Sequence, residues 1–85
     1  MSGIDSLLNV ARRYAEAEGV PLTTVSSRAL DDGKKLGAIN DGADINVRRL
    51  ERTMQWFSDN WPDAPWPSDV PRPVRSQAEP VEARA

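Results

Sequence analysis

Short hydroxyl side chains and basic residues cluster in the stretch LTTVSSRALDDGKK, which covers residues 22–35. A serine or threonine hydroxyl can donate a hydrogen bond to a phosphate oxygen or to a base edge without holding a helix away from a DNA groove. An arginine can make a bidentate contact with guanine or hold a phosphate. These residue types therefore offer recognition chemistry that suits a nucleic acid. The alternative is that serine and threonine at the start of a helix only cap it.

The composition argues against catalysis. The 85-residue chain contains no histidine and no cysteine, which excludes disulfides, thiolate chemistry, zinc sites built on those ligands and the usual general base. A chain of this length forms at most one domain and buries too little surface for a large enclosed pocket. We therefore expect a binding module that is not an enzyme and that uses no metal or cofactor.

The hydroxyl-rich stretch follows a predicted helix that breaks at a glycine. Apolar residues recur at three- and four-residue steps from Gly3 to Glu18, which predicts a helix with one buried face. Ser2 and Asp5 resemble a capping box at its start. Gly19 ends the helix, because glycine readily adopts the left-handed conformation needed just after a helix terminus. The apolar face consists of Ile4, Leu7, Leu8, Ala11, Tyr14 and Ala15.

Three further helices are predicted after the break. The second begins between Pro21 and Thr23, with a threonine able to cap it, and ends near Asp31. A short helix follows at 34–40, and the last begins after Asp44 as its cap. No segment shows the period of two that a strand requires, so the predicted fold is all-α, a compact bundle of about four helices. The last helix carries an apolar seam of Val47, Leu50, Met54, Phe57 and Trp61.

Prolines divide the chain into regions. Six of the seven lie in the last 24 residues, where they forbid regular helix and central strand. We expect a folded domain at residues 1–61 and a Pro/Trp-rich extended arm at 62–73 that packs on it. A disordered tail is expected at 74–85, which lacks the apolar surface to offset its ordering entropy.

Trp61 continues the seam, which favours core packing over a platform for single-stranded nucleic acid. Trp56 lies off the seam and covers the short third helix or contacts a second copy.

The corner around Gly19 has the steric pattern of a DNA-binding helix-turn-helix. Ala15 is small four residues before the glycine, Val20 after it is apolar, and Val25 can plug the corner. The pattern Ala15-x-x-x-Gly19-Val20 followed by Val25-Ser26 resembles the helix-turn-helix of bacterial and phage repressors. The run DGKKLGAINDGADINVRRLERTMQWFSDNWP, with WPSDVPRP after it, is similar to small helix-turn-helix regulators of alphaproteobacteria and their prophages.

The resemblance implies roles for residues of the second helix. Leu22, Thr23 and Ser27 occupy the motif positions that face the major groove. Thr24 and Ser26 occupy the positions that face the DNA backbone. The second helix is therefore the predicted recognition helix.

One position departs from the repressor pattern. Arg28 stands where the pattern has a branched apolar residue. Either the register slips so that Ala29 and Leu30 do the packing, which is the reading we favour, or Arg28 is freed to reach DNA.

Other basic residues give a less specific signal. Lys34 and Lys35 can hold a flanking phosphate, although a lysine pair on a surface is more often only solvated. Across residues 12–52 eight basic side chains stand against seven acidic ones, and the whole chain has a net charge of -2, so composition does not demand a nucleic-acid partner. A further basic group at the start of the last helix is assigned to helix solubility: Arg48, Arg49 and Arg52.

These patterns together favour a sequence-specific regulator of the repressor type that reads double-stranded DNA with the helix around residues 22–31. One short helix reads only a few base pairs, so we expect a homodimer that reads two half-sites about 34 Å apart. The alternative is an all-α adaptor that binds proteins through the arm at 66–73 and does not bind DNA. No small-molecule effector is evident. Because no apolar run approaches the roughly 18 to 20 residues that span a bilayer, and no secretory signal is present, we expect a cytoplasmic protein.

Overall fold

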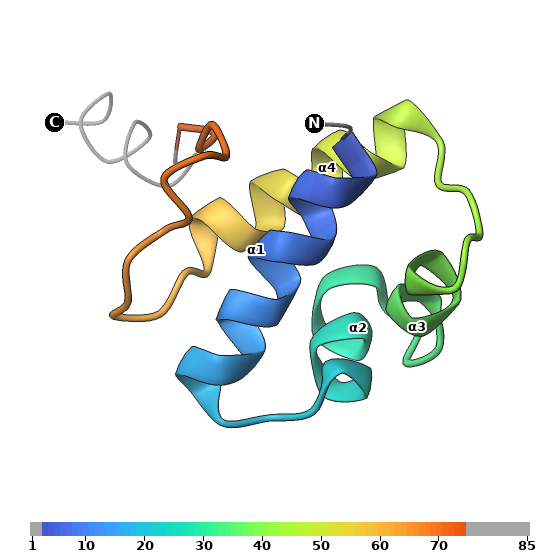
Figure 1. Cartoon of the computed structure of the whole chain (residues 1–85), viewed down its shortest axis with the longest axis horizontal. Coiled ribbons are helices and arrows are strands. Elements are labelled where there is room, and N and C mark those ends of the chain that lie inside the picture. Colours follow the sequence, from blue (N-terminus) through green and yellow to red (C-terminus); the bar gives the residue numbers. More distant parts are fainter. Residues whose placement is uncertain (1–2, 75–85) are drawn as a thin grey trace, which may run out of the picture.

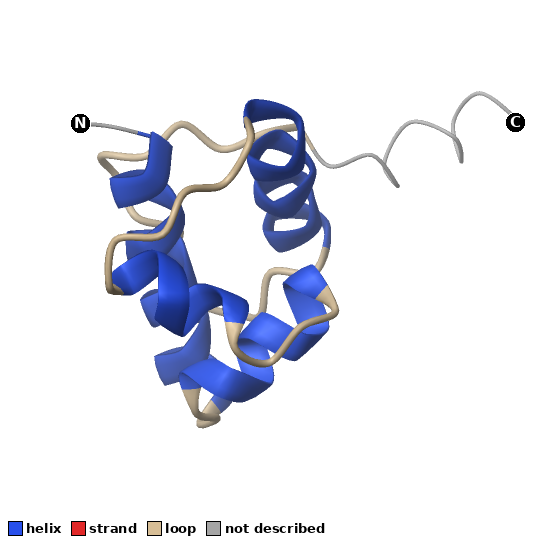
Figure 2. Ribbon diagram, turned by 90° about the vertical axis from the view of Figure 1, so that its right-hand side faces the viewer, coloured by secondary structure: helices blue, strands red, loops and turns tan. Residues whose placement is uncertain are grey.

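Four helices make up the body of the computed structural model, which describes residues 3–74 (Figure 1). Within that range there is no strand (Figure 2), so the prediction of an all-helical fold is confirmed. Ser2, the predicted cap of the first helix, and residues 75–85 of the predicted tail lie outside the described range. No helix within it is both long and apolar enough to cross a membrane. The helices are α1 (Gly3–Glu18), α2 (Leu22–Leu30), α3 (Lys35–Asn40) and α4 (Val47–Asp59).

The core forms where the four helices meet, and Val70 from the segment after α4 completes it. Tyr14 of α1 is 4 % exposed, and its ring centroid lies 5.5 Å from that of Phe57 and 5.6 Å from that of Trp56. The sequence predicts that Trp56 covers the third helix or contacts a second copy. Its ring packs against Tyr14 of α1, and the contact with a second copy stays a prediction. The predicted face of α1 is buried in large part, with Val10 added to it. The buried apolar residues are Leu7, Val10, Ala11, Tyr14, Val25, Leu30, Leu36, Ile39, Phe57 and Val70.

The connection between α1 and α2 is set by a left-handed glycine. Gly19 has a φ of 67°, and the amide of Val20 donates to the carbonyl of Ala15 over 3.1 Å. This is the hydrogen bond of a Schellman motif, which ends α1 and turns the chain toward α2. Pro21, and not a threonine, occupies the cap position of α2. The identification of this corner as a DNA-binding helix-turn-helix stays a prediction.

The start of α4 differs from the prediction by two residues. The side chain of Asn46 accepts a hydrogen bond from the amide of Arg49 over 2.8 Å, so Asn46 is the N-cap in place of Asp44. Asparagine and aspartate cap equally well, and the residue that caps is the one whose carbonyl begins the helical ladder. Here that carbonyl belongs to Asn46, which accepts from the amide of Leu50.

The predicted apolar seam of α4 is only partly buried. Phe57 is fully buried, but Val47 is 70 % exposed and Trp61 lies beyond the end of the helix. Two polar residues of α4 are buried although they lie outside the predicted seam, namely Thr53 and Ser58. The hydroxyl of Thr53 donates to the carbonyl one turn earlier, which satisfies it without a partner from another element.

The segment after α4 is held together by aromatic and polar contacts, and one of its side chains bonds to α4. The indole of Trp66 donates to the carbonyl of Val70 over 2.8 Å, and Val70 is 4 % exposed. The guanidinium of Arg72 donates to the carbonyl of Ser58 over 2.8 Å and lies 5.2 Å from the centroid of the Trp66 ring. In Figure 1 this segment lies on the other side of α1 from α2 and α3.

Candidate nucleic-acid interface

One face of α2 is buried and the other is exposed. Val25 is fully buried and Leu30 is 5 % exposed, because these side chains point toward the core. Thr23 and Ser27 lie four residues apart on the exposed side, one helical turn from each other. Neither hydroxyl has a hydrogen-bond partner within the described part of the chain. Two free hydroxyl groups on one exposed helix face are available to a ligand.

Ser26 is a correction to the predicted site. Its side chain is fully buried, so it cannot face a DNA backbone. Its hydroxyl donates to the carbonyl of Asp32 and accepts from the amide of Leu36 over 2.9 Å. Both partners lie beyond α2, so Ser26 ties the turn after α2 and the start of α3 to the helix. A buried hydroxyl with both functions satisfied is a structural element of the fold.

Two other predicted contacts are less accessible than the motif implies. Leu22 is half-buried and packs against the core, and Thr24 is half-buried at the edge of the exposed face. The turn after α2 passes close to the exposed face without covering it. A Cβ at Gly33 would lie 3.1 Å from the hydroxyl oxygen of Ser27, so glycine at this position allows the close approach. Thr23 and Ser27 remain the accessible pair of hydroxyls.

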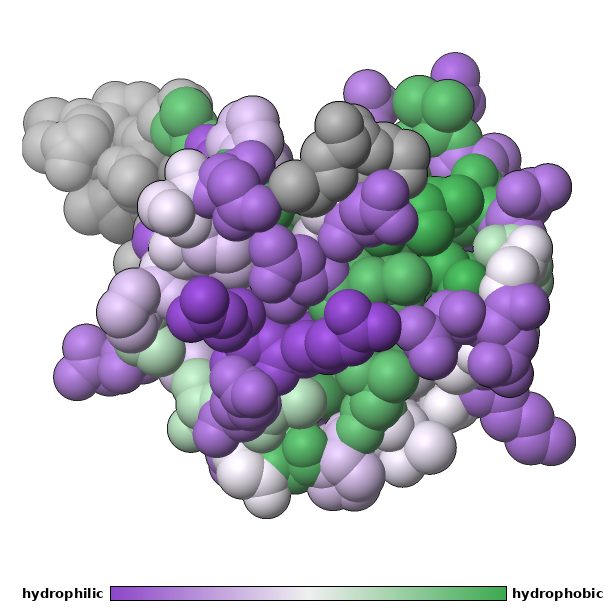
Figure 3. Space-filling view, viewed as in Figure 1, coloured by the Kyte–Doolittle hydropathy of each residue, from purple (hydrophilic) through white to green (hydrophobic). Residues whose placement is uncertain are grey.

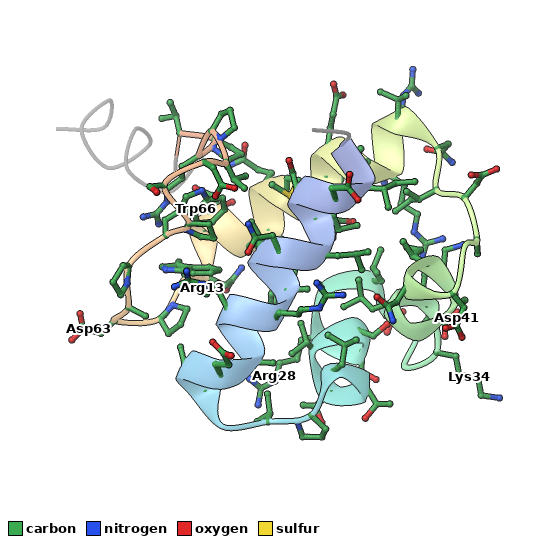
Figure 4. The ribbon with its side chains drawn as sticks, in the orientation of Figure 1. Arg13, Arg28, Lys34, Asp41, Asp63 and Trp66 are labelled. Carbon is green, nitrogen blue, oxygen red and sulfur yellow. The ribbon has the colours of Figure 1, made fainter. Side chains whose placement is uncertain are left out.

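Arg28 is exposed but held in place by α1. One guanidinium nitrogen donates to the hydroxyl of Tyr14 over 3.1 Å and to the carboxylate of Glu18 over 3.2 Å. The hydrogen bond with Tyr14, and after it the hydrogen bond and ion pair with Glu18, raise the pKa of Arg28. Leu30 is buried and Ala29 half-buried, so the packing register is the favoured one. Figure 4 shows Arg28 between the end of α1 and α2.

The two predicted lysines are placed differently from each other. Lys34 is exposed and its side chain extends away from the body of the molecule (Figure 4). Lys35 is half-buried, and its ammonium donates to the carbonyl of Asp44 over 3.4 Å. Asp32 is exposed next to Lys34 and its carboxylate accepts from the Lys34 amide. Lys34 alone of the pair is free to reach a phosphate.

A hollow between the end of α2 and the start of α4 brings three arginines together. Arg28, Arg49 and Arg52 line it, with Trp56 beside them and a volume of about 560 Å³. Arg49 donates to the carbonyl of Leu30 over 2.9 Å, which joins α4 to the end of α2. We call this hollow the arginine groove. It contains Arg49 and Arg52, for which the sequence predicts only a role in helix solubility. Their spacing of three residues puts them near each other on α4, but only the packing of α4 beside α2 brings them to Arg28.

Comparisons of the chain with protein-family models, with curated proteins and with solved structures found no match.

Proposed function

We propose that the protein is a sequence-specific regulator that binds double-stranded DNA by placing the exposed face of α2 in the major groove. The observation that carries this proposal is the pair of unpartnered hydroxyls of Thr23 and Ser27 on a helix face that no other described segment covers. Short hydroxyl side chains let the helix approach the base edges closely. The left-handed glycine corner that precedes α2 supports the same reading, because helix-turn-helix modules place the helix after such a corner in the major groove.

The charged residues around α2 differ in how they would act on a DNA backbone. Lys34 follows the turn after α2 and extends outward, where it supplies a charge for a flanking phosphate. Arg28 contributes charge at the edge of α2, although Glu18 and Tyr14 hold its guanidinium back toward α1. Ser26 takes no part. Exposed carboxylates at Asp31 and Asp32 oppose binding at the end of the helix, so the first two turns of α2 carry the contact.

The proposed regulator acts as a homodimer and as a repressor. One short helix cannot distinguish enough base pairs for useful specificity, whereas two copies read two half-sites. An apolar groove of about 370 Å³ is lined by Leu50, Met54, Val70 and residues around them. No residue of α2 lines it, so a second copy seated there leaves both recognition helices free. A small DNA-binding dimer regulates most simply by occupying its operator. We therefore propose that it represses transcription and does not activate it.

The proposal is tested by binding to duplex DNA at several salt concentrations. Fluorescence anisotropy with a labelled duplex should give an affinity whose logarithm falls linearly with the logarithm of the salt concentration, because phosphate contacts release counterions. Sedimentation of the complex should give two protein chains for each duplex. Absence of binding at low salt to a diverse pool of duplexes would contradict the proposal.

The second candidate is a protein-binding adaptor that uses the segment at 66–73. The contacts of that segment disfavour the adaptor. The indole of Trp66 already donates to the carbonyl of Val70, and the side chain of Val70 is buried in the core. A docking role would require these groups to leave the fold. An adaptor would also pass through a heparin column without retention, whereas the proposed regulator should elute with rising salt.

A further inference from the structure

The arginine groove combines features that suit one class of ligand. Its guanidinium groups come from two helices, with Arg28 on α2 and Arg49 and Arg52 on α4. The one acidic residue among those that line it is Asp31. Three guanidinium groups thus line the groove beside Asp31, and the carboxylate of Glu18 pairs with Arg28 from outside the lining. The volume of about 560 Å³ lies within the roughly 300–1,000 Å³ range of small-ligand sites.

The three arginines are not equally committed to the fold. Arg28 is held by Tyr14 and Glu18, and Arg49 is held by the carbonyl of Leu30. Arg52 is exposed, and its side chain forms no hydrogen bond or ion pair with any residue in the range 3–74. A guanidinium presents several N–H donors in a planar fork that matches the oxygens of a phosphate. Two positioned arginines and one free arginine can thus surround a tetrahedral anion.

We propose that the arginine groove binds a phosphate group. The start of α4 strengthens the site, because its N-cap residue Asn46 lines the groove and a helix N-terminus favours negative charge. Two sources can supply the group. One is the backbone of a duplex bound by α2, which rests on the proposed function. The other is a free phosphate ester, which does not depend on it. The contacts with the guanidinium groups are the same for both.

The site is tested by NMR titration of the ¹⁵N-labelled protein with inorganic phosphate and with AMP, and with adenosine as the uncharged control. The side-chain Nε–H signals of Arg28 and Arg52 and the indole signal of Trp56 should shift with phosphate and with AMP, and should stay in place with adenosine. Shifts that follow adenosine as strongly as AMP would overturn the proposal, since they would report stacking on Trp56 without a role for phosphate.

A matched pair of substitutions on α4 separates the groove from general positive charge. Arg52→Gln should weaken AMP binding about fivefold, because it removes one charged donor from an exposed site. Arg48→Gln changes an exposed arginine one turn away that does not line the groove, and should leave the affinity unchanged. Equal weakening by the two variants would overturn the proposal.

A third variant tests whether removing a negative charge from the groove strengthens the binding of phosphate. Asp31→Asn removes the one carboxylate among the lining residues, and asparagine tolerates the left-handed φ of 56° found there. AMP should bind about threefold more tightly to this variant. An affinity equal to that of the parent protein would place the phosphate away from Asp31 and would contradict the site.

The source of the phosphate is distinguished by a duplex titration of the same labelled protein. If duplex DNA shifts the Arg52 signal and AMP competes with it, the groove holds the DNA backbone. If duplex DNA shifts the amides of Thr23 and Ser27 but leaves Arg52 in place while AMP still binds, the ligand is a free ester and the proposed function stands. If AMP binds and duplex DNA shifts none of these signals, the groove stands and the proposed function fails.

Discussion

Ser26 and Ser27 are neighbours with the same side chain, yet α2 turns one into the interior and the other toward solvent. Ser26 is fully buried and joins α2 to the start of α3 through the amide of Leu36. Ser27 is exposed, and its hydroxyl has no partner among the described residues. The difference teaches that hydroxyl side chains of one helix can have different surroundings, and that only the exposed ones fit the DNA contact that we propose. One face of α2 holds the fold together, and the other is available for recognition.

The largest expected effect comes from the apolar part of the buried face. Leu30→Ala should lower the free energy of unfolding by about 2–4 kcal/mol, because Leu30 is 5 % exposed and its removal leaves a cavity. Urea denaturation followed by far-UV circular dichroism measures this. Val47→Ala is the matched control, because Val47 is 70 % exposed and its truncation should change the stability by less than about 0.5 kcal/mol. Similar losses in the two variants would contradict the assignment of the faces.

The polar part of the buried face should have the next largest effect. Ser26→Ala should cost about 1–3 kcal/mol, because it leaves the buried amide of Leu36 and the carbonyl of Asp32 without their partner. The measurement is the same denaturation experiment, with Ser27→Ala as control at less than about 0.5 kcal/mol. If Ser27→Ala were the more destabilising of the two, the orientation of α2 would be wrong.

The exposed face is tested by its effect on DNA and not on stability. The double variant Thr23→Ala with Ser27→Ala should keep its unfolding transition and lose about tenfold in discrimination between the preferred duplex and a mismatched one. Competition anisotropy with the two duplexes measures the ratio. Ser68→Ala, at an exposed serine outside α2, should leave it unchanged. A double variant with the preference of the parent protein would place the reading surface elsewhere.

The smallest expected effect concerns the corner that orients both faces. Gly19→Ala should cost about 1 kcal/mol, since alanine at a φ of 67° is strained although no atom within 4 Å obstructs it. Gly37→Ala in α3 should instead stabilise by about 0.5–1 kcal/mol, because its position is helical and also open. Thermal unfolding measures both effects. A lower melting temperature for Gly19→Ala and a higher one for Gly37→Ala support the left-handed corner, and a stabilising Gly19→Ala contradicts it.

The helices were largely predictable because their signals are local. The apolar spacing of α1 and the glycine that ends it act within a few residues, and the bounds predicted for α1 match the structure. The cap of α4 was not predictable in the same way. Asp44 and Asn46 are both good capping residues two positions apart, so the local sequence does not choose between them.

The site was harder to predict because it depends on tertiary contacts. Ser26 is buried where α3 packs against α2 and the amide of Leu36 donates to its hydroxyl. No pattern within α2 indicates this contact. The arginine groove joins Arg28 to Arg52 across 24 positions in the chain, and only the packing of α4 beside α2 brings them together. Figure 3 shows apolar surface between the start of α1 and the segment that leads into α4. This surface also depends on tertiary contacts, because its two sides are far apart in the sequence.

The most direct test of the central claim, that the exposed face of α2 reads duplex DNA, is selection of bound duplexes from a random library by the purified protein. The account predicts enrichment of a palindromic consensus whose half-site centres lie about 10 base pairs, or a multiple of one helical turn, apart. A selected pool with the same base composition at every position as the starting library would contradict it.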